Sequence, residues 1–178
     1  MRIIAGSRKG HKLFDFDGMD IRPTTDRVTE SIFNLIQWYI PGSDCLDLFG
    51  GSGALSFEAL SRGASSAVCV DIDERSIAVI KKNADVLKFP NLKIVRSDAL
   101  DFIKKTNDKY SVIFLDPPYN KGFIKPIIEA ICQNDLLSED GIILLESDGT
   151  DEHSEFDGLE IIKQKKYGRS YVTVYQRG

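Results

Sequence analysis

Cysteine is scarce in this sequence: its 178 residues include three, Cys45, Cys69 and Cys132. The three are widely separated, and two of them lie inside apolar runs, so they predict buried free thiols. A disulfide or zinc framework needs closely patterned cysteines, and this spacing does not provide them. We therefore expect no metal centre and a reducing, cytoplasmic compartment.

The chain also has little that would target or anchor it. Residues 1–6 include no apolar h-region like that of a signal peptide. No apolar stretch approaches the roughly 20 residues that a transmembrane helix needs. We expect a soluble intracellular protein that works without a membrane.

No internal repeat, low-complexity tract or linker-like stretch divides the chain. With 42% hydrophobic residues, 178 residues are enough for one well-buried domain and few for two. We expect a single domain over residues 1–178, and a monomer.

Charge is unevenly distributed along the chain. A formal net charge of −4 argues against a surface that coats nucleic acid all over. The first twelve residues nevertheless carry four cations and no acid, namely Arg2, Arg8, Lys9 and Lys12. We predict a basic arm at about residues 1–23, which is either a solvated terminus or, beside a site for a nucleobase, a phosphate-binding element.

Apolar runs and helical stretches alternate from residue 44 onward. Before them, residues 24–39 predict a helix, because apolar residues recur at helical spacing between capping threonines and a Pro-Gly stop. The alternation predicts an α/β fold with a mostly parallel, doubly wound sheet, and the last two runs, joined without a helix, predict an antiparallel hairpin. The expected strands are residues 45–49, 67–72, 92–95, 110–115 and 142–146, the hairpin strands are 159–166 and 170–175, and the helices are 54–61, 74–87, 99–104 and 123–134.

A glycine loop follows the first of these strands, in the segment Asp47-Leu48-Phe49-Gly50-Gly51-Ser52-Gly53. Ligands of a doubly wound sheet bind at the carboxyl ends of its strands. Gly51 and Gly53 let the backbone approach a ligand closely, and the free N–H groups of the next helix favour a carboxylate. Asp47 can accept from an ammonium group. An amino acid joined to a nucleoside satisfies both, and S-adenosylmethionine is such a molecule.

Acids also end the next two expected strands. Asp71, followed by Ile72, is placed to accept hydrogen bonds from both hydroxyls of a ribose. Asp98 can accept from an adenine amino group while the Ala99 N–H donates to a ring nitrogen, and it can equally cap the helix that follows. A dinucleotide fingerprint fits only in part, because Ser56 stands where the third glycine belongs, and no Walker loop follows the glycines.

The segment Asp116-Pro117-Pro118-Tyr119 follows the fourth expected strand. Proline has no N–H, so this stiff loop offers Asp116 and the Pro117 carbonyl as acceptors, and Tyr119 can stack on a flat ring. The exocyclic amine of a nucleobase is a poor nucleophile, and two acceptors on its hydrogens favour its reactive, pyramidal form. The same residues are also typical of a plain turn after a strand.

These motifs in order resemble a class I S-adenosylmethionine-dependent methyltransferase, with a Rossmann-like fold, that acts on amino groups of nucleobases. Segments outside that core are similar to the RsmD family, the bacterial 16S ribosomal RNA guanine-N2 methyltransferases. They are Arg2-Ile3-Ile4-Ala5-Gly6, Gly10-His11-Lys12-Leu13 and the run R-P-T-T-D-R-V-T-E-S-I-F-N that starts at Arg22. The similarity covers nearly the whole length, and the last run is its most specific part.

The resemblance implies a role for each motif. The region from Thr24 to Glu30 would close over the methionine end of the cofactor, and Asp116 to Tyr119 would lie at a target guanine that has been flipped out. The cofactor residues would be Thr25, Asp47, Phe49, Gly51, Gly53, Asp71, Ile72, Asp98 and Ala99. Phosphates of small-subunit ribosomal RNA, in a partly or fully assembled particle, would meet Arg2, Arg8, Lys9, Lys12, Arg22 and Arg27.

Two other functions stay open on the sequence alone. A DNA adenine-N6 or cytosine-N4 methyltransferase shares the Asp-Pro-Pro-Tyr chemistry, although such enzymes usually carry an added target-recognition region. A non-catalytic RNA-binding or ribosome-assembly protein could keep the fold without the activity.

Overall fold

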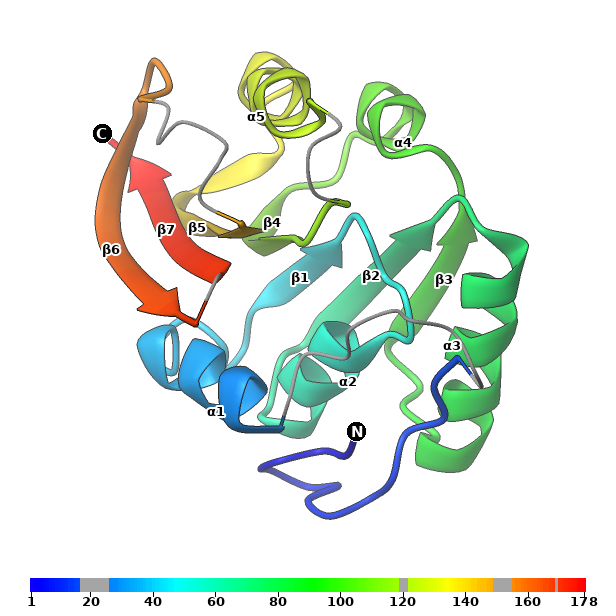
Figure 1. The fold of residues 1–178 in the computed structure, drawn as a ribbon. Coiled ribbons are helices and arrows are strands. Elements are labelled where there is room, and N and C mark those ends of the chain that lie inside the picture. Colours follow the sequence, from blue (N-terminus) through cyan, green and yellow to red (C-terminus); the bar gives the residue numbers. More distant parts are fainter. Residues whose placement is uncertain (17–25, 119–121, 149–154, 169) are drawn as a thin grey trace.

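The structure is a computed structural model that describes residues 1–16, 26–118, 122–148, 155–168 and 170–178. A first helix, α1 (Asp26–Leu35), precedes a regular alternation of strands and helices, and a strand pair ends the chain (Figure 1). The strands are β1 (Asp44–Asp47), β2 (Ser66–Asp71), β3 (Leu92–Arg96), β4 (Tyr110–Leu115), β5 (Leu137–Ser147), β6 (Leu159–Tyr167) and β7 (Ser170–Arg177). The other helices are α2 (Ala54–Ser61), α3 (Glu74–Leu87), α4 (Ala99–Lys105) and α5 (Ile124–Gln133).

The strands form one seven-stranded sheet in the order β3-β2-β1-β4-β5-β7-β6. β1 to β5 run parallel, whereas β7 is antiparallel to β5 and β6 is antiparallel to β7. The predicted α/β class, with a mostly parallel sheet and a C-terminal hairpin, is confirmed. The chain reverses its direction of winding between β1 and β4, which makes the carboxyl ends of these strands the expected place for a ligand.

Alternate residues of the central strands bury their side chains on opposite faces of the sheet, as the period of a strand requires. Ile113 packs on one face with α4 and α5, and its neighbours Val112 and Phe114 pack on the other with α1 and α2. A third buried cluster joins α2 and α3 to Ile3 and Leu13 near the N-terminus. Helices therefore cover both faces of the parallel part (Figure 1).

Two elements differ most from their expected bounds, and the others differ by at most two residues. α1 ends at Leu35 and not at residue 39, yet Ile36 and Ile40 are buried from the turns that follow, so the apolar spacing outlasts the helix. β5 begins at Leu137 and not at residue 142, because the exposed polar residues 139–140 break the apolar pattern near the start of the strand. The expected caps of α1, Thr24 and Thr25, lie outside the described residues.

The cysteines follow the prediction in part. Cys45 and Cys69 are buried free thiols, as their apolar runs predict. Cys132 is an exposed free thiol, so the prediction of burial is wrong there. Its neighbour Ile131 faces the core, and successive positions of a helix point in different directions. Within the described part of the chain, no helix is both long and apolar enough to cross a membrane.

The N-terminal segment, residues 1–16, is docked on the domain. Ile3 is 1% exposed. The backbone N–H groups of Ile4 and Ala5 donate to the buried Glu58 carboxylate, at 2.8 and 3.1 Å. Arg62 pairs with the same carboxylate at 2.6 Å. Charge-assisted hydrogen bonds therefore hold the segment on α2.

The turn of this segment reaches the far ends of α2 and α3. The Ser7 N–H donates to the Ser61 carbonyl at 2.8 Å, and Arg8 Nε donates to the Leu87 carbonyl at 3.0 Å. The Arg8 guanidinium also lies 5.4 Å from the ring centre of Phe89. Both helices begin at the carboxyl ends of strands and run back, so this turn lies toward the amino ends of the strands.

Candidate functional site

The carboxyl ends of the parallel strands carry a row of acids, and we call this side of the sheet the carboxyl edge. Asp47 ends β1 and Asp71 ends β2, while Asp98 follows β3 and Asp116 follows β4. Glu146 is the second-last residue of β5. The parallel register sets these ends side by side. Four predicted site acids are thus brought together, and Glu146 joins them.

The glycine loop between β1 and α2 has the backbone that only glycine adopts readily. Gly51 and Gly53 have φ of 55° and 82°. A Cβ on Gly53 would lie 2.6 Å from the buried ring of Phe57. Gly53 is the N-cap of α2 and provides no side-chain cap, so N–H groups at the start of α2 remain for an anion, although the Ser56 N–H bonds to Asp47.

Asp47 is a buried carboxylate with one oxygen in use. It is 2% exposed, and its Oδ2 accepts from the Ser56 hydroxyl at 3.0 Å. Oδ1 has no hydrogen-bond partner among the described residues. Burial raises the pKa of Asp47 to about 7, although the bonds from Ser56 and the Phe49 backbone oppose the shift. A buried acceptor without a donor is a place where a ligand's ammonium group fits.

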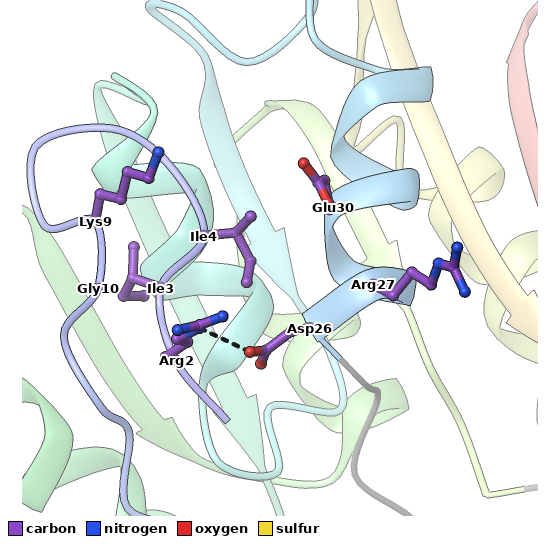
Figure 2. Close-up of a pocket in the computed structure, with 8 residues that line it drawn as sticks. All are labelled: Arg2, Ile3, Ile4, Lys9, Gly10, Asp26, Arg27 and Glu30. Atoms are coloured by element: carbon purple, nitrogen blue, oxygen red, sulfur yellow. Dashed lines mark hydrogen bonds and ion pairs between the residues drawn. The ribbon is translucent and has the colours of Figure 1, made fainter.

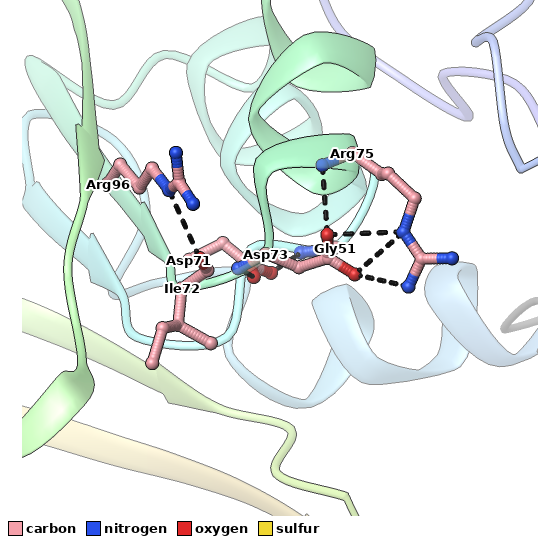
Figure 3. Close-up of polar contacts among 6 residues, drawn as sticks. All are labelled: Gly51, Asp71, Ile72, Asp73, Arg75 and Arg96. Atoms are coloured by element: carbon pink, nitrogen blue, oxygen red, sulfur yellow. Dashed lines mark hydrogen bonds and ion pairs between the residues drawn. The ribbon is translucent and has the colours of Figure 1, made fainter.

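Asp71 organises the end of β2 (Figure 3). Its Oδ2 accepts from the Gly51 N–H and its Oδ1 from the Asp73 N–H, both at 2.8 Å. Each carboxylate oxygen has two lone pairs, so each can accept one more bond from a ligand hydroxyl. Next to it, Ile72 is 64% exposed and offers an apolar surface. Asp73 in turn is held by Arg75, whose Nη2 lies 2.7 Å from Oδ2.

Asp98 makes the capping contacts that were one of its two interpretations. Its Oδ1 accepts from the N–H groups of Leu100 and Asp101, at 2.9 and 3.1 Å. Ala99 is buried as the first residue of α4. Contact of Asp98 and Ala99 with an adenine stays a prediction.

Asp116 is partly buried beside other acids. Burial raises its pKa to about 8, and the negative charges of Glu146 and Asp47 add to the shift. Pro117 is buried and Pro118 exposed, while Tyr119 lies outside the described residues. The loop thus keeps a carboxyl group in a strongly acidic surrounding.

Glu146 is a further candidate site residue, which the sequence motifs did not identify. It is 7% exposed, near the carboxyl end of β5, and its charge acts on Asp116. A buried acid at the end of an apolar strand, on the same edge as four others, was the signal available in the sequence. Another link across the edge is aromatic: the rings of Phe49 and Phe123 lie 6.2 Å apart and join the glycine loop to the start of α5.

The predicted phosphate-binding cations fall into two places. Arg2, Lys9 and Arg27 line a pocket of about 500 Å³ between the N-terminal segment and α1 (Figure 2). In this pocket Arg2 Nε donates to Asp26 at 2.8 Å. Arg8 lies instead at the ends of α2 and α3. The other two predicted cations are Lys12, which is exposed and forms a backbone bridge with Arg2, and Arg22, which lies outside the described residues, as does Thr25.

The sheet order, the glycine loop and the acids of the carboxyl edge together define a class I methyltransferase fold. The solved structure of yhhF from Escherichia coli has a TM-score of 0.89 and 35% identity, and covers 99% of this chain and 97% of that chain. SMU.776, solved in a complex with SAH, has a TM-score of 0.67 over 84% of this chain and 48% of that chain. At 20% identity, the likeness to SMU.776 shows the fold alone.

Sequence relatives identify the family. The family model described as Conserved hypothetical protein 95 matches residues 1–176. Ribosomal RNA small subunit methyltransferase D of Escherichia coli (strain K12) is 38% identical over 148 residues, which are 83% of this chain and 75% of the relative. YlbH of Bacillus subtilis (strain 168) is 40% identical over 182 residues, covering 99% of each chain. The chain belongs to the family of ribosomal RNA small subunit methyltransferase D, as the resemblance of its motifs predicted.

Proposed function

We propose that this protein transfers a methyl group from S-adenosylmethionine to the exocyclic N2 of a guanine in small-subunit (16S) ribosomal RNA. The observation that carries the proposal is the carboxyl edge, where a glycine loop without a side-chain cap lies beside two acids, Asp47 and Asp116, whose pKa values are raised by burial. The name of the Escherichia coli relative supports ribosomal RNA as the substrate. The Asp-Pro-Pro-Tyr loop supports an amino group as the acceptor.

The residues of the glycine loop fit the two ends of this cofactor. The orphan Oδ1 of Asp47 suits an α-ammonium, and the N–H groups at the start of α2 suit an α-carboxylate. The remaining lone pairs of Asp71 suit two ribose hydroxyls, and the exposed Ile72 suits an adenine face. When bound, S-adenosylmethionine supplies a methyl group on a positively charged sulfur, whose charge matches these acids.

Asp116 and the Pro117 carbonyl hold the acceptor amine in this proposal. Both accept its hydrogens, which directs the nitrogen lone pair toward the methyl group, and such positioning provides most of the acceleration. Methylation leaves the amine with one proton too many. A carboxylate with a pKa of about 8 is a base of suitable strength for that proton near neutral pH. Tyr119 completes the site by stacking on the flipped base.

RNA binding through cations is the remaining part of the proposal. A guanine inside a helix is out of reach, so the nucleotide is flipped out and its neighbours are held by their phosphates. Arg2, Lys9 and Arg27 line one pocket and are the first candidates. Arg8, Lys12 and Arg22 complete the proposed set.

Methyl transfer from labelled S-adenosylmethionine tests the proposal. Small ribosomal subunits from a strain that lacks the gene should take up label, and nuclease digestion should release N2-methylguanosine. Asp116→Ala protein, checked for an unchanged melting temperature, is the control. If duplex DNA alone took up label, the substrate would be DNA and not ribosomal RNA. A complete lack of transfer to any acceptor would favour a non-catalytic RNA-binding protein.

A further inference from the structure

The last strand pair carries a second basic stretch that the proposed site does not use. Residues 161–178 contain no aspartate or glutamate, and they contain the five cations Lys163, Lys165, Lys166, Arg169 and Arg177. Against a net charge of −4 for the whole chain, this stretch is strongly positive. Arg177 pairs with Asp135, and Lys163 donates to the Leu35 carbonyl at 2.6 Å.

The register of the sheet brings one end of this hairpin to the carboxyl edge. Lys166 is opposite Tyr171 in the pairing of β6 with β7, and Tyr171 is opposite Ser147 in the pairing of β7 with β5. Ser147 directly follows Glu146, the acid that acts on Asp116. At this end β7 lies next to β5 and β6 lies two strands from it, on the same edge of the sheet as the proposed active site.

Two lysines at this end lie over tyrosine rings, and because they are consecutive strand residues their side chains leave opposite faces of the sheet. Lys165 Nζ lies 5.5 Å from the ring centre of Tyr167, and Lys166 Nζ lies 5.2 Å from that of Tyr171. Both lysines are exposed, and neither pairs with a carboxylate among the residues that the structure describes. A cation over a ring keeps its charge available while its side chain is restrained. We call these four residues the hairpin tip.

The position of the hairpin tip distinguishes it from the turn of the N-terminal segment. That turn, with Arg8 and Lys9, is bonded to the far ends of α2 and α3, toward the amino ends of the strands. A flipped nucleotide at Asp116 leaves its strand running past the carboxyl edge on either side. Cations at this edge are better placed to hold the phosphates next to the target.

We propose that the hairpin tip binds the sugar-phosphate backbone of the RNA strand that flanks the target nucleotide. This inference rests on the proposed function, because it takes the RNA substrate as given. Exposed lysines beside aromatic rings are what proteins use to bind single-stranded RNA. The hairpin tip would form the β6 side of a substrate groove whose floor is the carboxyl edge.

Neutralising the two lysines tests the inference. Lys165→Gln/Lys166→Gln should weaken binding of a labelled fragment of small-subunit ribosomal RNA about tenfold or more at low salt. The slope of log affinity against log salt should fall by roughly 1.4 to 1.8, because each lost phosphate contact removes about 0.7 to 0.9. The KM for small ribosomal subunits should rise, with little change in kcat and none in S-adenosylmethionine affinity.

A second lysine pair provides a matched control. Lys104 and Lys105 are adjacent and exposed in the last turn of α4, away from the carboxyl edge. Lys104→Gln/Lys105→Gln removes the same charge and should leave the RNA affinity near that of the parent. Equal affinity and salt slope in both variants and the parent would overturn the inference while the parent still methylates RNA. A parent that methylates no RNA would instead overturn the proposed function.

Discussion

The acids of the carboxyl edge have different surroundings in its two halves, which are the ends of β1 to β3 and the ends of β4 and β5. On the β1–β3 half, Asp71 and Asp98 each accept two backbone N–H groups, so their carboxylates are fixed before any ligand arrives. On the β4–β5 half, burial and then the like charge of Glu146 raise the pKa of Asp116 to about 8. Asp71 and Asp98 are set by hydrogen bonds, whereas Asp116, like the buried Asp47 at the end of β1, is poised for a positive charge. The first arrangement suits holding a ligand, and at Asp116 the second suits chemistry.

Asp116→Ala should give the largest effect, because it should lower the rate of methyl transfer without lowering cofactor affinity. If Asp116 holds the acceptor amine, kcat for methyl transfer should fall by about 10² to 10⁴, the range for one positioned polar group. Cofactor affinity, measured by calorimetry, should change little. Asp140→Ala is a matched control, because Asp140 is an exposed acid near the start of β5, outside the proposed site. Equal losses of rate and cofactor affinity would place Asp116 on the cofactor half.

Gly53→Ala should weaken cofactor binding, because the glycine loop has no room for the added Cβ. Its Cβ would lie 2.6 Å from the Phe57 ring, and its φ of 82° disfavours any side chain. We expect cofactor affinity to fall and methyl transfer to slow roughly a hundredfold, which is the effect on rate of misplacing a positioned reactant by about 1 Å. Gly42→Ala is the control for backbone strain without crowding. Gly42 also has a positive φ, of 76°, but an added Cβ would have nothing within 4 Å. Similar cofactor affinities for the two variants would show that the loop is only a tight turn.

Asp71→Ala should weaken cofactor binding about tenfold to a hundredfold. A charge-assisted hydrogen bond contributes roughly 1.5 to 3 kcal/mol, and 1.4 kcal/mol is about a factor of ten. Asp71→Asn, which keeps one acceptor oxygen, should lose less. Asp73→Ala removes a neighbouring carboxylate that bonds Arg75 instead, and should bind the cofactor almost normally. Calorimetry that finds unchanged affinity in a folded Asp71→Ala protein would remove this residue from the site.

Local patterns in the sequence were enough to predict most of the fold. Period-two and helical spacing predicted β4, α2 and α3 with their observed bounds, because these elements bury one regular set of apolar residues. The order of acids at strand ends predicted where a ligand would lie, because parallel strands bring their carboxyl ends together.

Contacts between distant segments could not be read from local patterns. Asp116 and Glu146 are 30 residues apart, and only the register of β4 with β5 makes them neighbours. The bond from the Gly51 N–H to Asp71 likewise depends on how the loop folds over β2. The sequence predicted a basic arm at the N-terminus but not its docking on the domain. Glu58, the buried partner of this segment on α2, lies in an apolar stretch far along the chain.

The pH dependence of activity tests whether Asp116 titrates as its surroundings indicate. The kcat/KM reports groups of the free protein, in which the pKa of Asp116 is about 8. Because the charged form accepts the amine hydrogens, kcat/KM should rise about tenfold per pH unit below this value and level off above it. Asp116→Asn keeps an acceptor without titrating, so its profile should lose the step near pH 8. Identical profiles for the two proteins would assign the step to another group.

The titration of Asp116 should also change the free energy of unfolding, which should fall over the pH range in which activity rises. The folded pKa of Asp116 lies above the ordinary value of 3.8, so between about pH 4 and pH 8 the folded protein binds more protons than the unfolded chain. The free energy of unfolding should therefore decrease as pH rises through this window. Asp47, with a pKa of about 7, acts in the same direction. Asp116→Asn should flatten part of the decrease in denaturant titrations, and an unchanged slope would mean that Asp116 ionises normally. Only the part of the decrease that Asp116→Asn removes belongs to the β4–β5 half of the edge, because Asp47 lies at the end of β1.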